Sequence, residues 1–410
     1  MVWLLYCLKI AFLKNEKIKP KGYVLKIIKK QFYVYPPIMM LSLYLTTLGY
    51  MIPIMQNKFS LSLFEAGLFS SLQSVGLILS IILCFSIFSS LNKSRILLFG
   101  LSGLCLSVVL LGINNIAGLL FILFFFIGFF NNIVDTMSNA MIVDISESNK
   151  ELYVGLLHGL WAFMGAVGPY FVIIIGGEYK ITFVAIGFVM LISALIYYLG
   201  LKKDIKSPMM VDKSRLGGMN KLIRVVGKKG IPLAILVTFF SAATQVTLIF
   251  FLSAYIRNIR NSPNEGAIIL SMFFVGLLIG RITYAKIGYR YDKYTMLAIT
   301  NTIGLVAFSI MLMVNSFVLI SVFALIGGIC IASNIPAMVM EACKLIPNDT
   351  AAASSLIIFG MALSNLLIPP IIGRIGDAMG LKMAILIGVG FTVFVVVLCS
   401  KWFLSLRGRD

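Results

Sequence analysis

The sequence predicts an all-α integral membrane protein with twelve transmembrane helices in two pseudo-symmetric six-helix bundles. Three observations favour this class. Of the 410 residues, 60% are hydrophobic and only 12% are charged, about half the charged fraction of an ordinary soluble protein. The apolar residues form long continuous stretches, which in lipid must satisfy their own backbone hydrogen bonds as helices. The sequence also repeats itself at half its length.

The repeat is clearest in two runs 200 residues apart, EAGLFSSLQSVGL and EGAIILSMFFVGL, which begin at Glu65 and Glu265. A second match, AMIVD and AMVME, ends at Asp144 and at Glu341. Internal repeats of this length are typical of transporters built from two matched bundles.

Apolar stretches of about 20 residues, enough to cross a hydrocarbon core of about 30 Å, occur twelve times. They lie near 36–56, 64–90, 95–113, 116–144, 152–176, 181–201, 231–256, 265–288, 295–313, 317–343, 351–373 and 381–405. The predicted division of the chain is an amphipathic and basic N-terminal arm at 1–35, a first bundle at 36–201, a linker at 202–230, a second bundle at 231–406 and a tail at 407–410.

The net charge of +19 follows this topology, because lysine and arginine concentrate in the arm and the linker. By the positive-inside rule, both termini are expected in the cytoplasm, with the protein in the plasma (inner) membrane. The excess also attracts anionic lipid head groups, and nucleic acid is not an expected partner. Phosphate-loop, metal-ligand and nucleophile–base patterns are missing from the sequence. We therefore expect neither an enzyme nor a cofactor.

The basic loops after the second and eighth spans resemble the G-x-x-x-D-R-x-G-R-R signature of the major facilitator superfamily. The first copy, SSLNKSR at 89–95, keeps the basic residues without the Gly and Asp; the second has GR at 280–281 and YRYDK at 289–293. The stretches at 128–144 and 156–169 are also similar to this family, nearest to its fucose and glucose permease branch. The resemblance implies alternating-access transport of a small-molecule solute by a monomer.

Polar side chains inside spans are costly and are therefore the candidate functional residues. Asn131, Asp135 and Asn139 are spaced four residues apart in the fourth span, which places them on one helix face. Together with Asn132 they are expected to line the central cavity, where the amides bind solute and Asp135 binds a proton or a polar group. The alternative is a structural carboxylate that pairs with a neighbouring helix.

Other spans supply further candidates for solute or proton binding: His158, Trp161, Gln245, Asn334 and Asn365. His158 is the single histidine of the chain and could relay protons. It also begins a glycine-containing run of the kind found at close helix contacts, and a packing role fits it equally well.

The resemblance also implies a charge latch that closes the cytoplasmic side. Its expected members are the acids Asp144 and Glu341 with the bases Lys93, Arg95, Arg281, Arg290 and Lys293. Arg281 lies inside the eighth span, from which its long side chain can reach the cavity or, as the favoured interpretation, extend to the membrane surface.

The predicted function is secondary active uptake of a small polar solute, such as a sugar, coupled to protons or sodium. The first span has no acidic residue, so Asp135 would be the sole carrier carboxylate, and facilitated diffusion stays open. The alternative is a proton-coupled drug or metabolite exporter of the same superfamily. The exporters' fifth-span pattern, G-x-x-x-G-P-x-x-G-G, is matched poorly by GAVGPYFVII at 165–174. A non-transporting membrane sensor would need no inward polar stripe.

Overall fold

The structure, a computed structural model, describes residues 21–86, 91–145, 150–206, 230–288, 291–346 and 350–407, and these ranges contain helices but no strand. The helices are α2 (Lys21–Phe59), α3 (Leu63–Ser86), α4 (Lys93–Ile113), α5 (Ala117–Ile145), α6 (Lys150–Ile174), α7 (Tyr179–Lys206), α9 (Ile231–Arg260), α10 (Pro263–Ile287), α11 (Lys293–Met311), α12 (Phe317–Ile331), α13 (Asn334–Leu345), α14 (Thr350–Met379) and α15 (Leu381–Arg407). Twelve candidate membrane spans lie among them, because α12 and α13 together make one span. The predicted fold class is confirmed.

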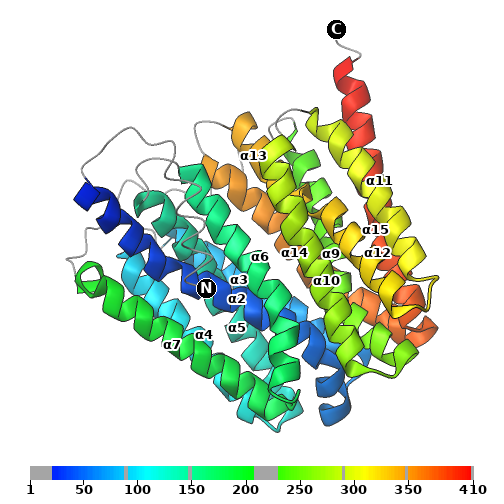
Figure 1. Cartoon of the computed structure of the whole chain (residues 1–410), viewed down its shortest axis with the longest axis horizontal. Coiled ribbons are helices and arrows are strands. Elements are labelled where there is room, and N and C mark those ends of the chain that lie inside the picture. The colour runs from blue at the N-terminus through cyan, green and yellow to red at the C-terminus, as the bar shows by residue number, and fades with distance from the viewer. Residues whose placement is uncertain are drawn as a thin grey trace.

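The helices form two bundles, α2 to α7 and α9 to α15, which lie side by side (Figure 1). In the first bundle α3 packs against α5, α4 against α5 and α7, and α2 against α6 and α7. In the second, α10 packs against α12, α11 against α12 and α15, and α9 against α14 and α15. The second set repeats the first in the same helix order, so the sequence repeat is also a structural one.

Glycines allow the same close helix contact in both bundles. A Cβ on Gly76 of α3 would lie 2.1 Å from the carbonyl oxygen of Phe125 in α5, and one on Gly276 of α10 would lie 2.3 Å from that of Leu325 in α12. Both distances are too short for any real side chain, so only glycine permits the contact. Each residue of the second contact is 200 positions after its counterpart.

Helix starts repeat at the same offset. Ser62 and Glu65 form a capping box at α3, in which the Glu65 N–H donates to Ser62 Oγ over 3.1 Å and the Ser62 N–H donates to the Glu65 carboxylate over 2.8 Å. In the second bundle the Glu265 N–H donates to Ser262 Oγ over 3.4 Å. The Glu265 carboxylate instead forms a 2.6 Å ion pair with Arg260.

The first helix begins earlier than the predicted span. α2 starts at Lys21, inside the predicted arm, so that Pro36 and Pro37 lie within the helix. Gly200 of α7 lies so close to the Tyr33 ring that a Cβ on it would come within 2.3 Å. The part of α2 that precedes the predicted span therefore packs against α7 around Tyr33.

The arm and the linker are described in part. Residues 1–20 of the predicted arm and 207–229 of the predicted linker lie outside the described ranges. The last helix ends at Arg407, where the predicted tail begins.

The tenth span is broken between α12, which ends at Ile331, and α13, which begins at Asn334. Pro336 gives the reason, because proline has no N–H to donate to the carbonyl of Ala332 four residues earlier and its ring clashes with that group. The equivalent fourth span is one continuous helix, α5.

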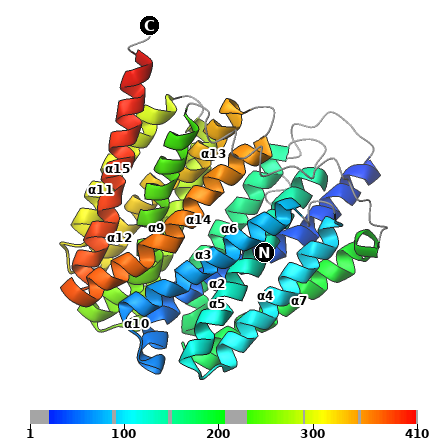
Figure 2. The ribbon, with the colours of Figure 1, turned by 180° about the vertical axis from the view of Figure 1, so that it is seen from behind.

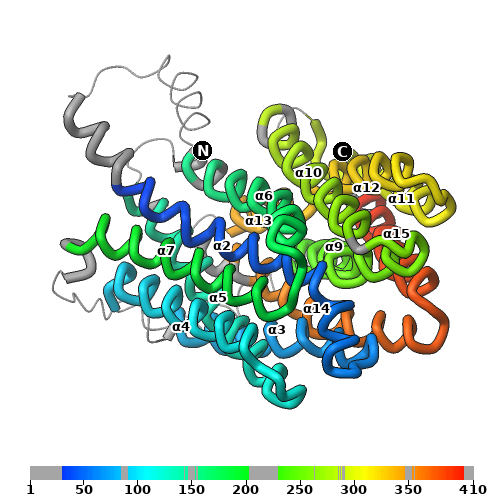
Figure 3. The backbone as a smooth tube through the Cα atoms, turned by 60° about the horizontal axis from the view of Figure 1, so that its bottom comes forward, coloured from blue at the N-terminus to red at the C-terminus, as the bar shows by residue number. Residues whose placement is uncertain are grey.

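The two bundles meet along α3 with α14, α6 with α10, and α2 with α9. Figure 2 shows α3 and α14 side by side, and Figure 3 shows α6 of one bundle next to α10 of the other. Between α2 and α9, a Cβ on Gly49 would lie 2.3 Å from the carbonyl oxygen of Ile249. The candidate functional side chains are therefore located relative to these three contacts between the bundles.

Candidate transport site

The exposure of side chains along α5 separates an outer side from an inner side. Ile122 and Phe126, with exposed fractions of 54% and 43%, mark the outer side. At about 100° per residue, Asp135 lies about 140–180° away from them, and Asn131 and Asn139 lie within about 40° of Asp135. All three polar residues are half-buried. The inner side of α5 therefore carries them together and leaves them partly accessible.

Asp135 receives a hydrogen bond from its own helix. The Asn139 amide donates to Oδ1 of Asp135 over 3.0 Å and to the Asp135 main-chain carbonyl over 2.9 Å. Among the described residues, no basic side chain lies within salt-bridge distance of the carboxyl group. An acid with a neutral donor beside it and access to water can take up and release a proton without breaking an ion pair.

The neighbouring Asn132 has different partners. It is buried, and its Nδ2 donates to Ser80 Oγ of α3 over 3.1 Å. The Thr136 hydroxyl donates to Oδ1 of Asn132 over 3.5 Å. Both ends of this amide are therefore engaged inside the first bundle, where the hydrogen bond to Ser80 joins α5 to α3.

Trp161 of α6 and Arg281 of α10 meet between the two bundles. Cζ of Arg281 lies 5.1 Å from the centroid of the Trp161 ring, and this ring lies 6.3 Å from the ring of Phe274 in α10. His158 lies one turn before Trp161 in the same helix. The guanidinium group thus lies against the opposite bundle, whereas the sequence analysis favoured its extension to the membrane surface.

This cluster lies on the inner sides of its two helices. Phe163 marks the outer side of α6 and Ile279 that of α10, with exposed fractions of 41% and 42%. At about 100° per residue, His158 is about 140° from Phe163 and Arg281 about 160° from Ile279. Nevertheless His158 is exposed and Arg281 is half-buried. Part of each side chain is therefore accessible on the inner side of its helix.

The remaining solute candidates differ in how their polar groups are satisfied. Gln245 of α9 is buried, and its Nε2 has no hydrogen-bond partner. Asn334 exchanges two hydrogen bonds of 2.8 Å with Asn301 of α11. Asn365 is half-buried, and its main-chain carbonyl accepts a hydrogen bond from Ser70 of α3 over 2.9 Å. Gln245 therefore has a buried amide donor without a partner, whereas the Asn334 amide is already bonded to Asn301.

The acids at the ends of the fourth and tenth spans pair with lysines of the adjacent basic segments. Lys93 lies 2.5 Å from Asp144, and Lys293 pairs with Glu341, which also accepts a 3.0 Å hydrogen bond from the Tyr294 hydroxyl. The side chains of the first pair are 29% and 56% exposed, and those of the second are 16% and 15% exposed. The second pair is therefore better shielded from water.

Each of these ion pairs joins two helices of one bundle, α4 to α5 or α11 to α13. In this conformation each ion pair therefore stabilises its own bundle and does not connect the two bundles. Arg95 is exposed in the first turn of α4, and Arg290 lies outside the described residues. The charge latch that would close the cytoplasmic side stays a prediction.

Asp377 joins the bundles at the end remote from the termini. Its carboxylate accepts hydrogen bonds from the main-chain N–H groups of Leu63 and Phe64, both over 2.9 Å. An acid from α14 of the second bundle thus caps the N-terminus of α3 in the first bundle, where the helix dipole favours negative charge. The sequence analysis did not single out Asp377, because no local motif marks a cap that comes from 314 residues away.

The same junction continues along α3 and α14. The Ser71 hydroxyl donates to the carbonyl oxygen of Leu366 over 2.6 Å. A Cβ on Gly67 would lie 2.5 Å from the carbonyl oxygen of Pro369. The bundles are therefore in direct backbone contact at the end of the molecule opposite the termini.

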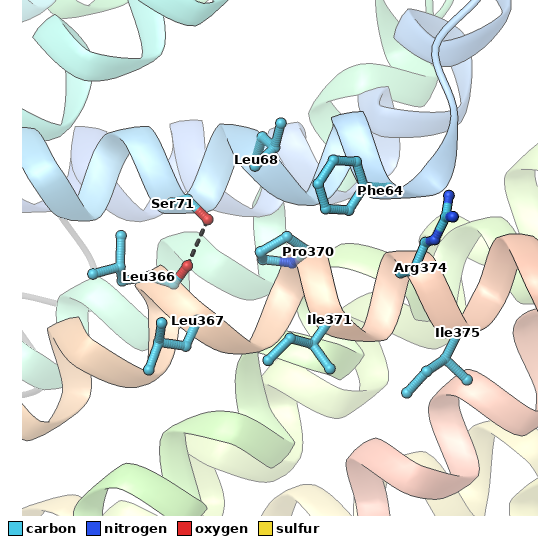
Figure 4. A pocket seen from close by; sticks show the side chains of 9 residues that line it. All are labelled: Phe64, Leu68, Ser71, Leu366, Leu367, Pro370, Ile371, Arg374 and Ile375. Carbon is cyan, nitrogen blue, oxygen red and sulfur yellow. Dashed lines mark hydrogen bonds between the residues drawn. The ribbon is translucent and has the colours of Figure 1, made fainter.

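A shallow groove of about 650 Å³ runs along this junction (Figure 4). It is lined by Phe64, Leu68, Ser71, Leu366, Leu367, Pro370, Ile371, Arg374 and Ile375. Three of its apolar side chains are exposed, namely Phe64, Leu367 and Ile371. The groove contains none of the polar candidates on α5, α6, α9 or α10, so we do not assign transport to it.

Two matched six-helix bundles with polar side chains on their inner faces define a membrane transporter and not an enzyme. The family model described as Major Facilitator Superfamily matches residues 38–222 and 234–409. The chain belongs to the major facilitator superfamily.

Solved structures share this fold. The structure of a bacterial homologue of the human lysosomal transporter Spinster, inward-facing and unoccupied, covers 95% of this chain and 98% of its own, with a TM-score of 0.69 and 16% identity. Its inward-facing, occupied form gives the same values. A mutant of the nucleoside transporter NupG covers 92% of this chain and 100% of its own, with a TM-score of 0.73 and 12% identity.

At these identities the likeness shows the fold. No curated protein matches the sequence significantly. The fucose and glucose permease branch stays a prediction.

Proposed function

We propose that this protein is a secondary active transporter that moves a small polar solute together with a proton, with Asp135 as the proton-binding group. The observation that carries the proposal is the position of Asp135 on the accessible inner face of α5, bonded to the neutral Asn139 amide and to no described base. An intramembrane acid on an accessible surface is the usual position for a coupling site. Asn131, on the same face, and Gln245 are the proposed solute ligands.

The mechanism that fits this arrangement is alternating access. Asp377 and Ser71 hold the bundles together at the end remote from the termini. His158 and Arg281 remain accessible on the inner faces nearer the termini. Rocking of one bundle against the other would open the junction at Asp377 and Ser71. It would also close the region of His158 and Arg281 around a central site.

We further propose that the termini face the cytoplasm. Lysine and arginine gather in the segments on the side of the termini, and the positive-inside rule places such segments in the cytoplasm. The conformation described here is then inward-facing, and Asp377 lies on the external side.

The proposal is tested with Asp135→Asn in proteoliposomes that carry an inward proton gradient. Asparagine has a similar shape but cannot bind and release a proton, so gradient-driven accumulation of solute is expected to fall to the level of empty vesicles. Exchange of labelled solute across the membrane is expected to persist. The experiment measures solute uptake and internal pH at the same time, and the first solutes tested are a panel of neutral sugars.

Glu178→Gln is the matched control, because it removes an exposed acid outside the bundle interior and should leave accumulation unchanged. Normal accumulation by Asp135→Asn at equal expression would remove Asp135 from the mechanism. Proton efflux driven by lipophilic cations, with no response to polar solutes, would instead identify an exporter.

A further inference from the structure

Arg281 is a charged side chain inside a span, and the proton-coupling mechanism proposed above assigns it no role. It lies on the inner side of α10, about 160° from the outward-facing Ile279. Its guanidinium Cζ is 5.1 Å from the Trp161 ring of the opposite bundle. It is half-buried, and its Nε is buried without a hydrogen-bond partner. This guanidinium group therefore lies inside the protein with part of its donor capacity unused.

The groups around Arg281 do not neutralise it. Among the described residues it takes part in no salt bridge. Asp135 is bonded to Asn139, and Glu341 is paired with Lys293. A cation removed from water without a counter-charge is costly, so the position favours an anion supplied from outside the chain.

The geometry fits an oxyanion. An indole beside a guanidinium group stabilises the cation through its π electrons. Guanidinium is planar, and its edge donors match the two oxygens of a carboxylate or a phosphate. His158, one turn from Trp161 and exposed on the same inner side, can contribute a further donor. The excess of positive charge over the whole chain, +19, also raises the local concentration of anions.

We propose that the transported solute carries a carboxylate or phosphate group and that Arg281 binds it, with Trp161 orienting the guanidinium group. This inference rests on the proposed transport function and narrows its substrate class from polar solutes to organic anions. A monoanion such as a carboxylate that moves with one proton carries no net charge across the membrane, whereas a phosphate dianion moved with one proton carries one negative charge.

Trp161 provides a direct binding assay that does not depend on transport. The chain has three tryptophans, at positions 3, 161 and 402, so Trp3→Phe with Trp402→Phe leaves Trp161 as the single reporter beside the site. Purified protein in nanodiscs is titrated with glucose, gluconate, glucose 6-phosphate and inorganic phosphate. Gluconate or a phosphate compound is expected to change the Trp161 fluorescence saturably, and glucose is expected to have no effect.

Arg281→Gln is expected to weaken this response by about tenfold or more, and Arg281→Lys to weaken it less, because it keeps the charge and loses the fork of donors. Lys286→Gln is the matched control, since it removes an exposed positive charge from the same helix and should bind like the parent. Equal melting temperatures of the variants establish that each is folded.

The outcomes are distinct. Saturable binding of an anion that is lost in Arg281→Gln supports the proposal. Whether gluconate or a phosphate compound binds then shows whether the site recognises a carboxylate or a phosphate group. A response to glucose alone, to none of the compounds, or to anions with equal strength in Arg281→Gln overturns it. Failure of proton coupling in the Asp135 experiment would leave this binding result unaffected, so the two proposals fail separately.

Discussion

At the residue scale, the hydrogen-bonded Asp and Asn side chains inside the spans fall into two groups according to where their partners lie. Asp135 and Asn139 bond within one helix, and helical spacing predicts such a pair directly. Asn132 and Asn334 bond to Ser80 and Asn301 on other helices. Those contacts depend on how each helix is rotated in its bundle, which spacing along one helix does not specify.

The two ion pairs at the span ends give a prediction at the same scale. Glu341→Gln should lower the melting temperature more than Asp144→Asn. Lys293 and Glu341 are only about one-sixth exposed, and Lys93 and Asp144 more so. Loss of one partner from a shielded pair costs about 1–3 kcal/mol, whereas an exposed pair contributes about 0–1 kcal/mol.

Thermal unfolding of the purified variants in detergent measures this difference. Lys293→Gln combined with Glu341→Gln should lose less stability than the two single changes added together, because no charge remains unpaired. An equal effect of Glu341→Gln and Asp144→Asn would contradict the shielding argument.

At the scale of elements, the starts of equivalent helices repeat at an offset of 200 residues. Ser62 and Ser262 both accept from the N–H of the glutamate three residues later. Such capping signals are local and therefore visible in a sequence. The additional cap on α3 is not local, because Asp377 belongs to the opposite bundle. Because it lies at a junction between the bundles, we expect the Asp377 cap to break when this end of the molecule opens.

Asp377→Ala should open the end remote from the termini. Loss of a cap costs about 1 kcal/mol, which corresponds to about a fivefold increase in the population of the open form. The reporter is Ser70→Cys in a background without native cysteines, labelled by an impermeant maleimide from the external side. The labelling rate is expected to rise by about that factor.

Asp292→Ala is the control for this experiment. Asp292 accepts from the Thr295 N–H over 2.8 Å and caps α11 within the second bundle, so its loss should leave labelling of the Ser70 position unchanged. Equal labelling in Asp377→Ala and the parent would show that this cap does not hold the bundles together.

At the scale of the whole molecule, two bundles that move as units require that contacts inside a bundle persist while contacts between bundles break. The Ser71–Leu366 hydrogen bond crosses the junction. Ser94 and Met141, with 3.9 Å between Oγ and the sulfur, lie within the first bundle. Covalent links at these two places should therefore have opposite effects.

A disulfide between Ser71→Cys and Leu366→Cys should abolish transport, and reduction should restore it. A disulfide between Ser94→Cys and Met141→Cys should leave the rate near that of its reduced form. The measurement is solute flux before and after oxidation, with native cysteines removed. Continued transport by the Ser71–Leu366 cross-linked protein would exclude rocking at this junction.

The orientation of the molecule gives a further prediction. A single cysteine placed after Arg407 should react with an impermeant thiol reagent only when cells are opened, because the C-terminus is proposed to face the cytoplasm. A cysteine in place of Glu178, which is exposed at the other end of the first bundle, should react on intact cells. The reverse pattern would invert the proposed topology and the direction of every gate.

Composition and periodicity determined the class of this protein, the twelve spans, the twofold repeat and the shared face of Asp135 and Asn139, because these follow from residues close together in the chain or from a repeat of the chain itself. The position of Arg281 against Trp161 and the cap that Asp377 places on α3 came from the fold. In both cases the partners belong to different bundles, and their meeting depends on how the helices of the twelve spans are rotated and packed against one another.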